Sequence, residues 1–181
     1  MKVYSLVGPS AAGKSTAIKK LSVEYNVLDL NYMELNTFNL DNRLMVAKWK
    51  YIDYWFSSIL ESKRNGIEHL LTDRCPIDTC AYVSKGEDYL LYCLTQTFEE
   101  LKKLGINMYF ILITADLHVL ENRIKDRIKR EANRINYNEL NKFHNKKAYD
   151  FFSRNKNLWN SIIDTSCKKP EDVVELIKAE L

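Results

Sequence analysis

The hydrophobic residues of this chain fall into two kinds of pattern that follow one another from end to end. Short, nearly continuous apolar runs are typical of strands buried in a parallel sheet. Five such runs occur, at residues 2–7, 26–30, 67–72, 107–113 and 158–164. Between them lie longer stretches in which apolar residues recur every three or four positions, as in amphipathic helices. Strands that alternate with helices predict an α/β doubly wound sheet with five parallel strands.

The clearest helical stretch runs from about residue 41 to residue 64. A long helix with one buried face is predicted there by apolar residues at helical spacing, namely Met45, Trp49, Ile52, Phe56 and Ile59. Further helices are expected after the first strand, at residues 89–104, from about 116, at 143–149 and from 170 onwards. Gly66 and Gly105 each follow a lysine-bearing helical stretch and precede an apolar run, so both are expected to end a helix.

The composition is that of a soluble globular protein, and the 181 residues are expected to form a single domain. The net charge of only +3 argues against a dedicated nucleic-acid-binding protein. No apolar run approaches the ~20 residues that span a membrane. The first strand begins next to Met1, which leaves no room for a signal peptide, so a cytoplasmic protein is expected. The cysteines lack the paired spacing of zinc ligands and are expected to be reduced thiols.

The segment between the first strand and the helix after it carries a specific chemical signature. Residues 8–16 read Gly-Pro-Ser-Ala-Ala-Gly-Lys-Ser-Thr, which matches the phosphate-binding pattern G-x-x-x-x-G-K-[ST]. The glycines let successive backbone N–H groups converge on phosphate oxygens, and the following helix adds its positive end. Lys14 is expected to reach the β- and γ-phosphates of ATP, and Ser15 to bind Mg²⁺. The nucleotide-binding residues predicted here are Gly8, Ala11, Ala12, Gly13, Lys14, Ser15 and Thr16.

Asp73 and Arg74 follow the third apolar run directly. In an open parallel sheet, ligands bind at the carboxyl ends of the strands. An acidic residue in this place is typical of the carboxylate that holds Mg²⁺ through water in phosphate-loop enzymes, so Asp73 is predicted to lie beside Ser15 at the metal. The structural alternative for Asp73 and Arg74 is a pair of helix-capping residues.

Four arginines share one face of the helix that starts near residue 116. They are spaced by four, three and four residues, and they are Arg123, Arg127, Arg130 and Arg134. At ~100° per residue they fall within about 60° of one another, so their charges repel unless the face meets an anion. The planar guanidinium group binds phosphoryl oxygens at two points and stabilises their charge. A solvated basic face is the alternative.

The sequence contains fewer indications of the residues that bind the acceptor, the substrate that would receive the phosphoryl group. If the acceptor is a nucleoside, its hydroxyl needs a general base, and the candidates are Asp29 at the end of the second strand and Glu34 just after it. Trp49 belongs to an aromatic group on the long helix that could stack against a base, although core packing is the commoner use of such residues. His144 is expected to be a surface or packing residue, because phosphoryl transfer needs no histidine.

Taken together, these residues make the chain resemble the nucleoside and nucleoside-monophosphate kinases of the phosphate-loop proteins, over nearly its whole length. The loop at 8–16, the Asp73-Arg74 strand end, the arginine-bearing helix and the final strand-loop-helix occur in the order of that group. The nearest pattern is that of thymidylate kinases, in which an Asp-Arg motif precedes an Ala-Tyr pair, here Ala81-Tyr82. Deoxynucleoside kinases are similar too, with an acid-Arg-Ser motif in place of Asp73-Arg74-Cys75.

The resemblance implies a P-loop kinase fold with an arginine-bearing lid at about residues 120–140. The roles that it implies are acceptor contact for Arg74, closure over the transferring phosphoryl group for Arg123, Arg127 and Arg130, and a place beside the adenine of ATP for Thr165 and Ser166.

The predicted function is therefore ATP- and Mg²⁺-dependent phosphoryl transfer to a nucleotide, with a (deoxy)nucleoside monophosphate such as dTMP as the expected acceptor. A deoxynucleoside kinase is the first alternative. A kinase of another small molecule, and an NTP-dependent switch or nucleic-acid-end binding protein, are the others. The chain is expected to act as a monomer or a homodimer, with no membrane partner.

Overall fold

The strands of the chain lie side by side in one parallel sheet. The computed structural model, which describes residues 1–30, 44–131 and 139–181, orders these strands β2-β3-β1-β4-β5. In sequence order they are β1 (Lys2–Val7), β2 (Val27–Asp29), β3 (His69–Asp73), β4 (Asn107–Thr114) and β5 (Ser161–Asp164). Every pairing is parallel, and β1 is the central strand. The predicted α/β architecture with a five-stranded parallel sheet is confirmed.

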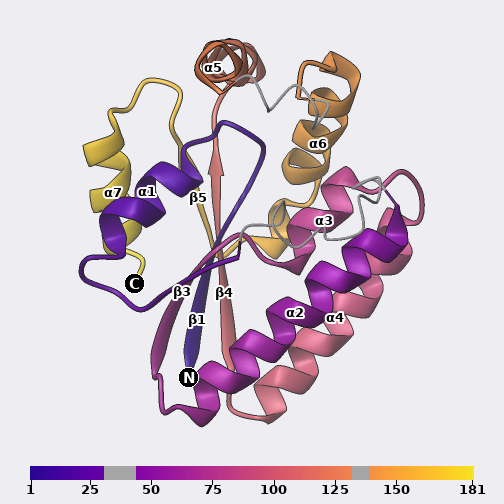
Figure 1. The fold of residues 1–181 in the computed structure, drawn as a ribbon, viewed down its shortest axis with the longest axis vertical. Coiled ribbons are helices and arrows are strands. Elements are labelled where there is room, and N and C mark those ends of the chain that lie inside the picture. The colour runs from indigo at the N-terminus through magenta and orange to yellow at the C-terminus, as the bar shows by residue number, and fades with distance from the viewer. Residues whose placement is uncertain (31–43, 132–138) are drawn as a thin grey trace.

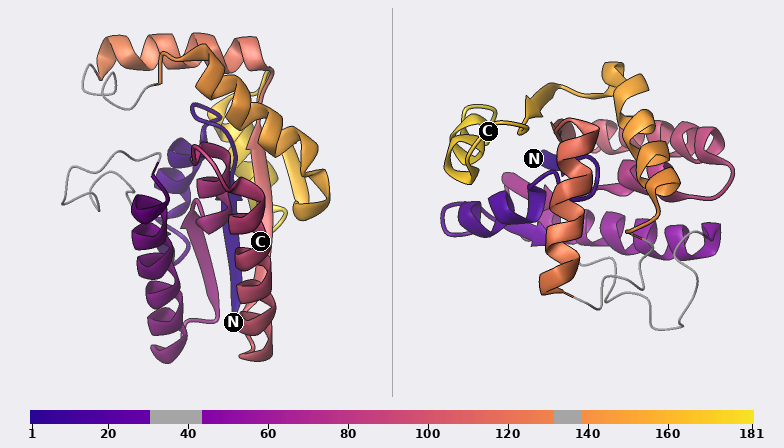
Figure 2. Two further views of the ribbon diagram at one scale, coloured as in Figure 1. Left: turned by 90° about the vertical axis from the view of Figure 1, so that its right-hand side faces the viewer. Right: turned by 90° about the horizontal axis from the view of Figure 1, so that it is seen from above.

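Helices connect the strands and cover both faces of the sheet (Figure 1). They are α1 (Lys14–Leu21), α2 (Met45–Arg64), α3 (Pro76–Tyr82), α4 (Glu87–Lys103), α5 (Leu117–Arg130), α6 (Lys142–Arg154), the short 3₁₀ helix η2 (Lys156–Leu158) and α7 (Pro170–Lys178). Helices α1 and α7 pack together on one face, whereas α2, α3, α4 and α6 cover the other. Helix α5 crosses the end of the sheet to which the strands point, as Figure 2 shows.

The central strand joins two hydrophobic cores through its alternating side chains. Val3 and Val7 pack against residues of α2, α3, α4 and α6. Tyr4 and Leu6 point to the opposite face and pack against residues of α1 and α7. Because both faces of β1 are covered, its side chains are apolar almost throughout, as the sequence predicts. Lys2, which is exposed at the start of the strand, and Ser5 are the polar exceptions, and Ser5 is fully buried.

The structure differs from the sequence-based expectation in three elements. The fifth strand begins only at Ser161, because residues 156–158 form η2 and Trp159 turns into the core, where its Nε1 donates to the carbonyl of Phe152 (3.0 Å). The third strand begins at His69, two residues later than expected. Helix α3, directly after β3, was not predicted at all. The long helix begins at Met45 in the described part of the chain, and the expected start near residue 41 lies outside it.

Other expectations concern single residues. Gly66 and Gly105 have φ values of +77° and +74° and lie just beyond the ends of α2 and α4, so both are confirmed as residues that end a helix. Trp49 was expected on the buried face of α2, but 42% of it is exposed, and this expectation is wrong. No helix in the three described ranges is long and apolar enough to cross a membrane.

Candidate functional site

The loop between β1 and α1 has the backbone geometry of a phosphate-binding loop. Gly8, Ala11 and Gly13 all have positive φ values, of 140°, 63° and 105°. A Cβ at Gly8 would lie 2.1 Å from the carbonyl oxygen of Ile113 in β4, so no other residue fits there. At Gly13 the space is open, and the requirement for glycine comes from its φ alone.

Lys14 folds back over this loop. Its Nζ donates to the carbonyls of Gly8 (2.6 Å) and Pro9 (2.9 Å), and the side chain is buried. Burial lowers the pKa of Lys14 to about 8, because the ammonium group loses its water, and the nearby carboxylate of Asp78 opposes that shift. Within the described part of the chain, the hydrogen bonds of the Lys14 ammonium group go to backbone carbonyls of the loop that it would serve, and an anion in the loop would offer it stronger partners.

Ser15 and Asp73 meet at the carboxyl end of β3. The Oγ of Ser15 donates to Asp73 Oδ2 at 2.7 Å. Asp73 is buried, and its second oxygen, Oδ1, has no hydrogen-bond partner among the described residues. A buried carboxylate oxygen without a partner is unfavourable and calls for a ligand such as a cation or a bound water. The structure thus brings together the two residues predicted at Mg²⁺, and their chemistry fits that ion.

Asp78, in the first turn of α3, is a residue that the sequence analysis missed. Its Oδ1 accepts from the backbone N–H of Gly8 (3.1 Å), and its Oδ2 accepts from the N–H of Cys75 (2.9 Å). Burial raises the pKa of Asp78, and Lys14 and the two backbone N–H groups counteract this effect. The run Cys75-Pro76-Ile77-Asp78 has proline at the first helical position and an acid two residues later, which is the signal that could have revealed this short helix.

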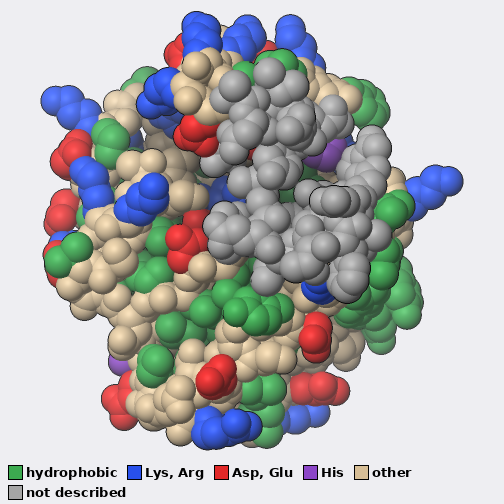
Figure 3. Space-filling model, viewed as in Figure 1, with side chains coloured by type: hydrophobic (Ala, Val, Ile, Leu, Met, Phe, Trp, Pro, Cys, Tyr) green, Lys and Arg blue, Asp and Glu red, His purple; other side chains and the backbone are tan. Residues whose placement is uncertain are grey.

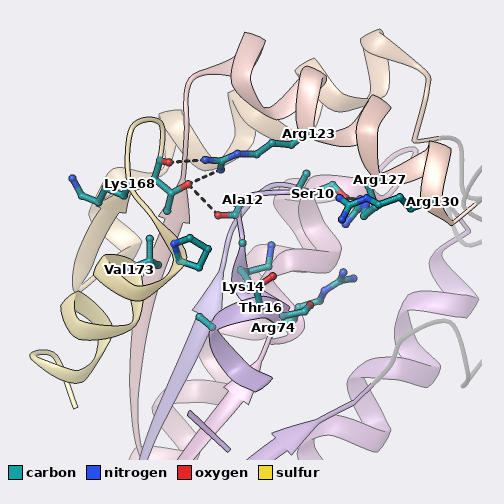
Figure 4. Close-up of a pocket in the computed structure, with 16 residues that line it drawn as sticks. Ser10, Ala12, Lys14, Thr16, Arg74, Arg123, Arg127, Arg130, Lys168 and Val173 are labelled. Carbon is teal, nitrogen blue, oxygen red and sulfur yellow. Dashed lines mark hydrogen bonds between the residues drawn. The ribbon is translucent and has the colours of Figure 1, made fainter. Parts of the chain in front are cut away.

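A pocket of about 460 Å³ opens beside the loop (Figure 4). The predicted site residues that line it are Ala11, Ala12, Gly13, Lys14, Ser15, Thr16, Arg74, Arg123, Arg127, Arg130 and Thr165. Five lining residues were not predicted as site residues, Ser10, Ala17, Lys168, Pro170 and Val173. The last three stand at the start of α7 and just before it, where the sequence shows no binding motif. The pocket therefore unites four separate parts of the sequence, at residues 10–17, at Arg74, at 123–130 and at 165–173.

Arg123 is bound to the loop after β5. Its Nη1 donates to Thr165 Oγ1 (2.8 Å) and its Nη2 to the carbonyl of Thr165 (2.6 Å). The Thr165 hydroxyl also lies 3.1 Å from the carbonyl oxygen of Ala12 in the phosphate loop. This geometry fixes one side of α5 against the loop and turns the Arg123 guanidinium toward the α7 end of the pocket (Figure 4).

Arg127 meets an acid at the other side of the pocket. It forms an ion pair with Glu139 at 2.6 Å, and its Nη2 also donates to Ser10 Oγ at 2.9 Å. Arg130 lines the pocket nearby, while Arg134 lies outside the described residues. Lysine and arginine side chains stand out at the α5 end of the molecule (Figure 3). The expected arginine face thus borders the phosphate loop.

The remaining predicted residues lie away from the pocket or outside the description. Ser166 does not line the pocket, since its Oγ donates to Asp164 Oδ1 (2.6 Å) and accepts from the N–H of Asp116 (2.8 Å). Asp29 is the register partner of Asp73 on the neighbouring strand and is exposed. Trp49 lies on α2, and Glu34 falls outside the described ranges.

Comparison with known proteins shows the fold. No family model matches the sequence, and no curated protein matches it. The structure of deoxyadenosine kinase from M. mycoides with bound dATP matches with a TM-score of 0.63 at 18% identity, over 99% of this chain and 98% of that one. The same kinase with the products dCMP and dCDP bound has a TM-score of 0.63 at 16% identity, over the same shares of the two chains.

A second protein has a similar structure. YorR from Bacillus subtilis, solved in complex with phosphorylated GDP, has a TM-score of 0.62 at 15% identity, over 98% of this chain and 94% of that chain. The chain therefore has the phosphate-loop kinase fold expected from its sequence. The match to structures with this fold extends over almost the whole chain. At these identities, the likeness defines the fold, and the chemistry must be argued from the site.

Proposed function

We propose that this chain is a kinase that uses ATP and Mg²⁺ to phosphorylate a nucleoside or a nucleoside monophosphate. The observation that carries the proposal is the convergence in one pocket of the phosphate loop and several arginines, with Asp73 bound to Ser15 of the pocket lining. Each of these groups has a separate task in phosphoryl transfer, which depends on positioning and on stabilisation of phosphate charge. A nucleotide-binding switch would need the loop but would not need the arginines.

The donor is proposed to lie along the loop, with its phosphates over the N-terminus of α1. The backbone N–H groups of the loop and the Lys14 ammonium would then bind phosphate oxygens. The phosphates would replace the carbonyls of Gly8 and Pro9 as partners of Lys14. The base of the donor would occupy the end of the pocket near Thr165 and Pro170, on the side to which Arg123 points.

Ser15 and Asp73 would hold the magnesium ion. The unpartnered Asp73 Oδ1 is the oxygen that the ion or one of its waters would satisfy. When bound, Mg²⁺ neutralises charge on the phosphate oxygens. The Ser15 hydroxyl, which now donates to Asp73 Oδ2, would turn its lone pairs toward the cation.

Arg74, Arg127 and Arg130 are proposed to bind the phosphoryl group as it moves between donor and acceptor. All three line the pocket on the side away from Val173 (Figure 4). Arginine suits this task because its planar donors match phosphoryl oxygens at two points. The ion pair with Glu139 shows that Arg127 already holds an anionic group at this place.

A deoxynucleoside is the acceptor that the proposal favours. Likeness to deoxyadenosine kinase supports this choice, and so does the position of Asp29, whose strand partner is Asp73. Asp29 would take the proton from the acceptor hydroxyl while the hydroxyl oxygen bonds to the γ-phosphorus. The bond from the γ-phosphorus to the β,γ-bridging oxygen breaks, and ADP leaves.

A nucleoside monophosphate such as dTMP is the second candidate, and the Asp73-Arg74 motif followed by Ala81-Tyr82 favours it. Its phosphate oxygen is already anionic and needs no base. Asp29→Asn separates the two acceptors, since it should reduce phosphorylation of a nucleoside and leave that of a monophosphate nearly unchanged. Glu34 is the alternative base, so Glu34→Gln is the companion variant.

The deciding experiment incubates the purified protein with ATP, Mg²⁺ and a panel of nucleosides and monophosphates, and follows ADP and the phosphorylated product. Lys14→Ala should abolish turnover, and the matched control Lys19→Ala, an exposed lysine of α1, should not. ATP hydrolysis without transfer to any acceptor would refute the kinase and favour a switch. Transfer only to sugars or other small molecules would move the chain to a different kinase class. Gel filtration of the same sample tests the expected monomer or homodimer.

A further inference from the structure

Arg74 has a backbone conformation that is rare for a residue with a side chain. Its φ is +74°, in the left-handed region. A Cβ makes this region unfavourable, so it persists only where the surrounding structure enforces it. Arg74 also lines the pocket beside the phosphate loop. The question is which groups impose this conformation.

Three elements hold the two peptide groups that flank Arg74. Its N–H donates to the carbonyl of Leu6 in β1 at 3.0 Å. Its carbonyl accepts from the hydroxyl of Thr72 in β3 at 2.8 Å. The next N–H, that of Cys75, donates to Asp78 Oδ2 in α3 at 2.9 Å. The left-handed turn is therefore fixed on both sides of the Arg74 Cα.

The hydrogen bond from Thr72 has a defined direction. Thr72 Oγ1 lies 2.8 Å from the Arg74 carbonyl oxygen and 2.8 Å from Ser5 Oγ. A carbonyl oxygen can only accept, so the single proton of the Thr72 hydroxyl points to Arg74. Ser5, the register partner of Thr72 on β1, must then donate to Thr72. Both side chains are fully buried, where a hydroxyl is retained only with its partners in place.

Asp78 ties the same turn to the phosphate loop. While its Oδ2 holds Cys75, its Oδ1 accepts from the N–H of Gly8 at 3.1 Å. The carboxylate is buried, so both contacts are shielded from water. One side chain thus sets the spacing between the residue after Arg74 and the first residue of the loop.

We propose that Thr72 and Asp78 are positioning residues that hold the strained backbone of Arg74 and so place its guanidinium beside the phosphate loop. The kinetic part of this inference rests on the proposed function. At a fully buried strand position an aliphatic residue such as valine would pack as well as threonine. The role that we assign to the hydroxyl of Thr72 is therefore to stabilise the backbone turn at Arg74 through its hydrogen bond to the Arg74 carbonyl.

Thr72→Val is the central test, because it keeps the shape of the side chain and removes the hydroxyl. With the acceptor that the wild type uses, kcat should fall about tenfold to a hundredfold, while KM for ATP changes little. Thr72→Ser should restore most of the rate. Thr79→Val is the matched control, since it removes another buried threonine hydroxyl, which donates to the carbonyl of Pro76 (2.6 Å) and not to that of Arg74.

A double-mutant cycle separates positioning from general damage. In an Arg74→Ala background, Thr72→Val and Asp78→Asn should cause little further loss of rate, because the side chain that they position is gone. Additive losses would overturn the proposal. If Thr72→Val fails to fold because the Ser5 hydroxyl is left alone, the double change Ser5→Ala with Thr72→Val removes both partners and takes its place.

Hydrogen exchange tests the structural part of the proposal, that Thr72 and Asp78 hold the turn, and it needs no measurement of enzyme activity. In the Thr72→Val protein, the amides of residues 74, 75, 77 and 78 should exchange faster than in the wild type, and those of α7 should not change. Unchanged exchange at these amides would refute the positioning role even in an active enzyme. A wild type that phosphorylates no acceptor would refute the proposed function, while exchange would still decide whether Thr72 and Asp78 hold the turn.

Discussion

At the scale of single residues, the site depends on groups whose conformation or charge would be unfavourable elsewhere. Gly8 has no room for a side chain, Arg74 has a left-handed backbone, and Asp73 buries an oxygen that has no hydrogen-bond partner in the part of the chain that the structure describes. Such features reduce stability, and they persist where the surrounding structure enforces them or where a ligand uses them. Two predictions test whether they belong to function or to the fold.

Gly8→Ala should remove nucleotide binding and destabilise the protein by at least about 3 kcal/mol, because the new Cβ would lie 2.1 Å from the Ile113 carbonyl oxygen. Calorimetry of ATP binding and thermal melting would measure both effects. Gly66→Ala is the control. Its φ is also positive, at +77°, but the space around it is open, so it should cost only about 1 kcal/mol and leave binding intact. Normal ATP binding by Gly8→Ala would contradict the described loop.

Asp73→Asn should lower the rate of phosphoryl transfer by about a hundredfold and yet leave the ligand-free protein as stable as the wild type or more so. The amide keeps an oxygen for the Ser15 hydroxyl and removes the buried charge. Thermal melting without nucleotide or Mg²⁺, together with the kinase assay, would show the two opposite effects. Asp53→Asn, an exposed carboxylate on α2, should change neither. A strongly destabilised Asp73→Asn protein would indicate a structural role.

Several residues of the site could be identified from the sequence, and the reasons are local. The loop from Gly8 to Thr16 is recognised by spacing alone, because its chemistry needs fixed residue types at fixed intervals. The contact between Arg123 and Thr165 could not be found in this way, because 42 residues separate them and each could have many partners. Ser166 was placed beside the nucleotide by resemblance, and its hydroxyl is instead engaged by Asp164 and Asp116.

At the scale of elements, long periodic segments were predicted well and short ones were not. Helix α3 has seven residues, too few for a helical period to show. The apolar pair Leu158 and Trp159 reads as the start of a strand, but the tryptophan packs in the core beside Phe152 and the strand begins after it. The periodicity of apolar residues also predicted wrongly that Trp49 lies on the buried face of α2. The apolar stripe on this helix is wide, so the sequence does not show which of its residues lie at the exposed edge. Tertiary packing decides such cases.

The contact between α4 and α6 provides a prediction at this scale. Glu87, at the start of α4, pairs with Lys147 (2.9 Å) and with Arg154 of α6. Burial raises the pKa of Glu87, but the hydrogen bonds from Lys147 and Arg154 outweigh it and hold the pKa below its usual 4.5. A carboxylate with a lowered pKa stabilises the fold above its unfolded-state pKa and loses that effect as the pH falls through its folded-state pKa.

Glu87→Gln should therefore destabilise the protein by up to about 1 kcal/mol at pH 7, because the pairs are partly exposed and screened. The difference from the wild type should shrink as the pH falls below 4.5, where the wild-type carboxylate also becomes protonated. Denaturant unfolding at pH 7, 5 and 3.5 measures this trend. Glu99→Gln, an exposed residue of the same helix, should show no difference at any pH. A constant difference across the series would assign the effect to packing instead of charge.

At the scale of the whole molecule, the pocket joins both halves of the sheet. The β3 side supplies Arg74, the β4 and β5 side supplies Arg123 and Thr165, and the loop after the central strand lies between them. A ligand that contacts both halves should raise the free energy of unfolding of the whole domain, because it binds the folded state and not the unfolded chain. The contacts that hold the pocket together are therefore contacts of the fold itself.

Saturating ATP with Mg²⁺ should raise the melting temperature by roughly 5 to 10 °C. A ligand at a hundred times its dissociation constant adds about 2.7 kcal/mol, and each kcal/mol raises the melting temperature of a chain of this size by about 2–4 °C. Differential scanning fluorimetry would measure the shift. Lys14→Ala should abolish most of it and Lys19→Ala should not. An equal shift in all three proteins would indicate binding elsewhere on the molecule.

The central position of β1 also has a consequence for how the protein is made. Lys2 pairs with His69 on one side and with Asn107 on the other. Strand β1 therefore cannot pair until β3 and β4, which are synthesised much later, are available. Gly8 likewise reaches its close contact with Ile113 only when β4 is in place. Pairing between such distant segments is slow and leaves unpaired strands exposed while the chain is being completed. During synthesis on the ribosome, the phosphate loop is made before β4, and it becomes competent to bind only after that strand has been added.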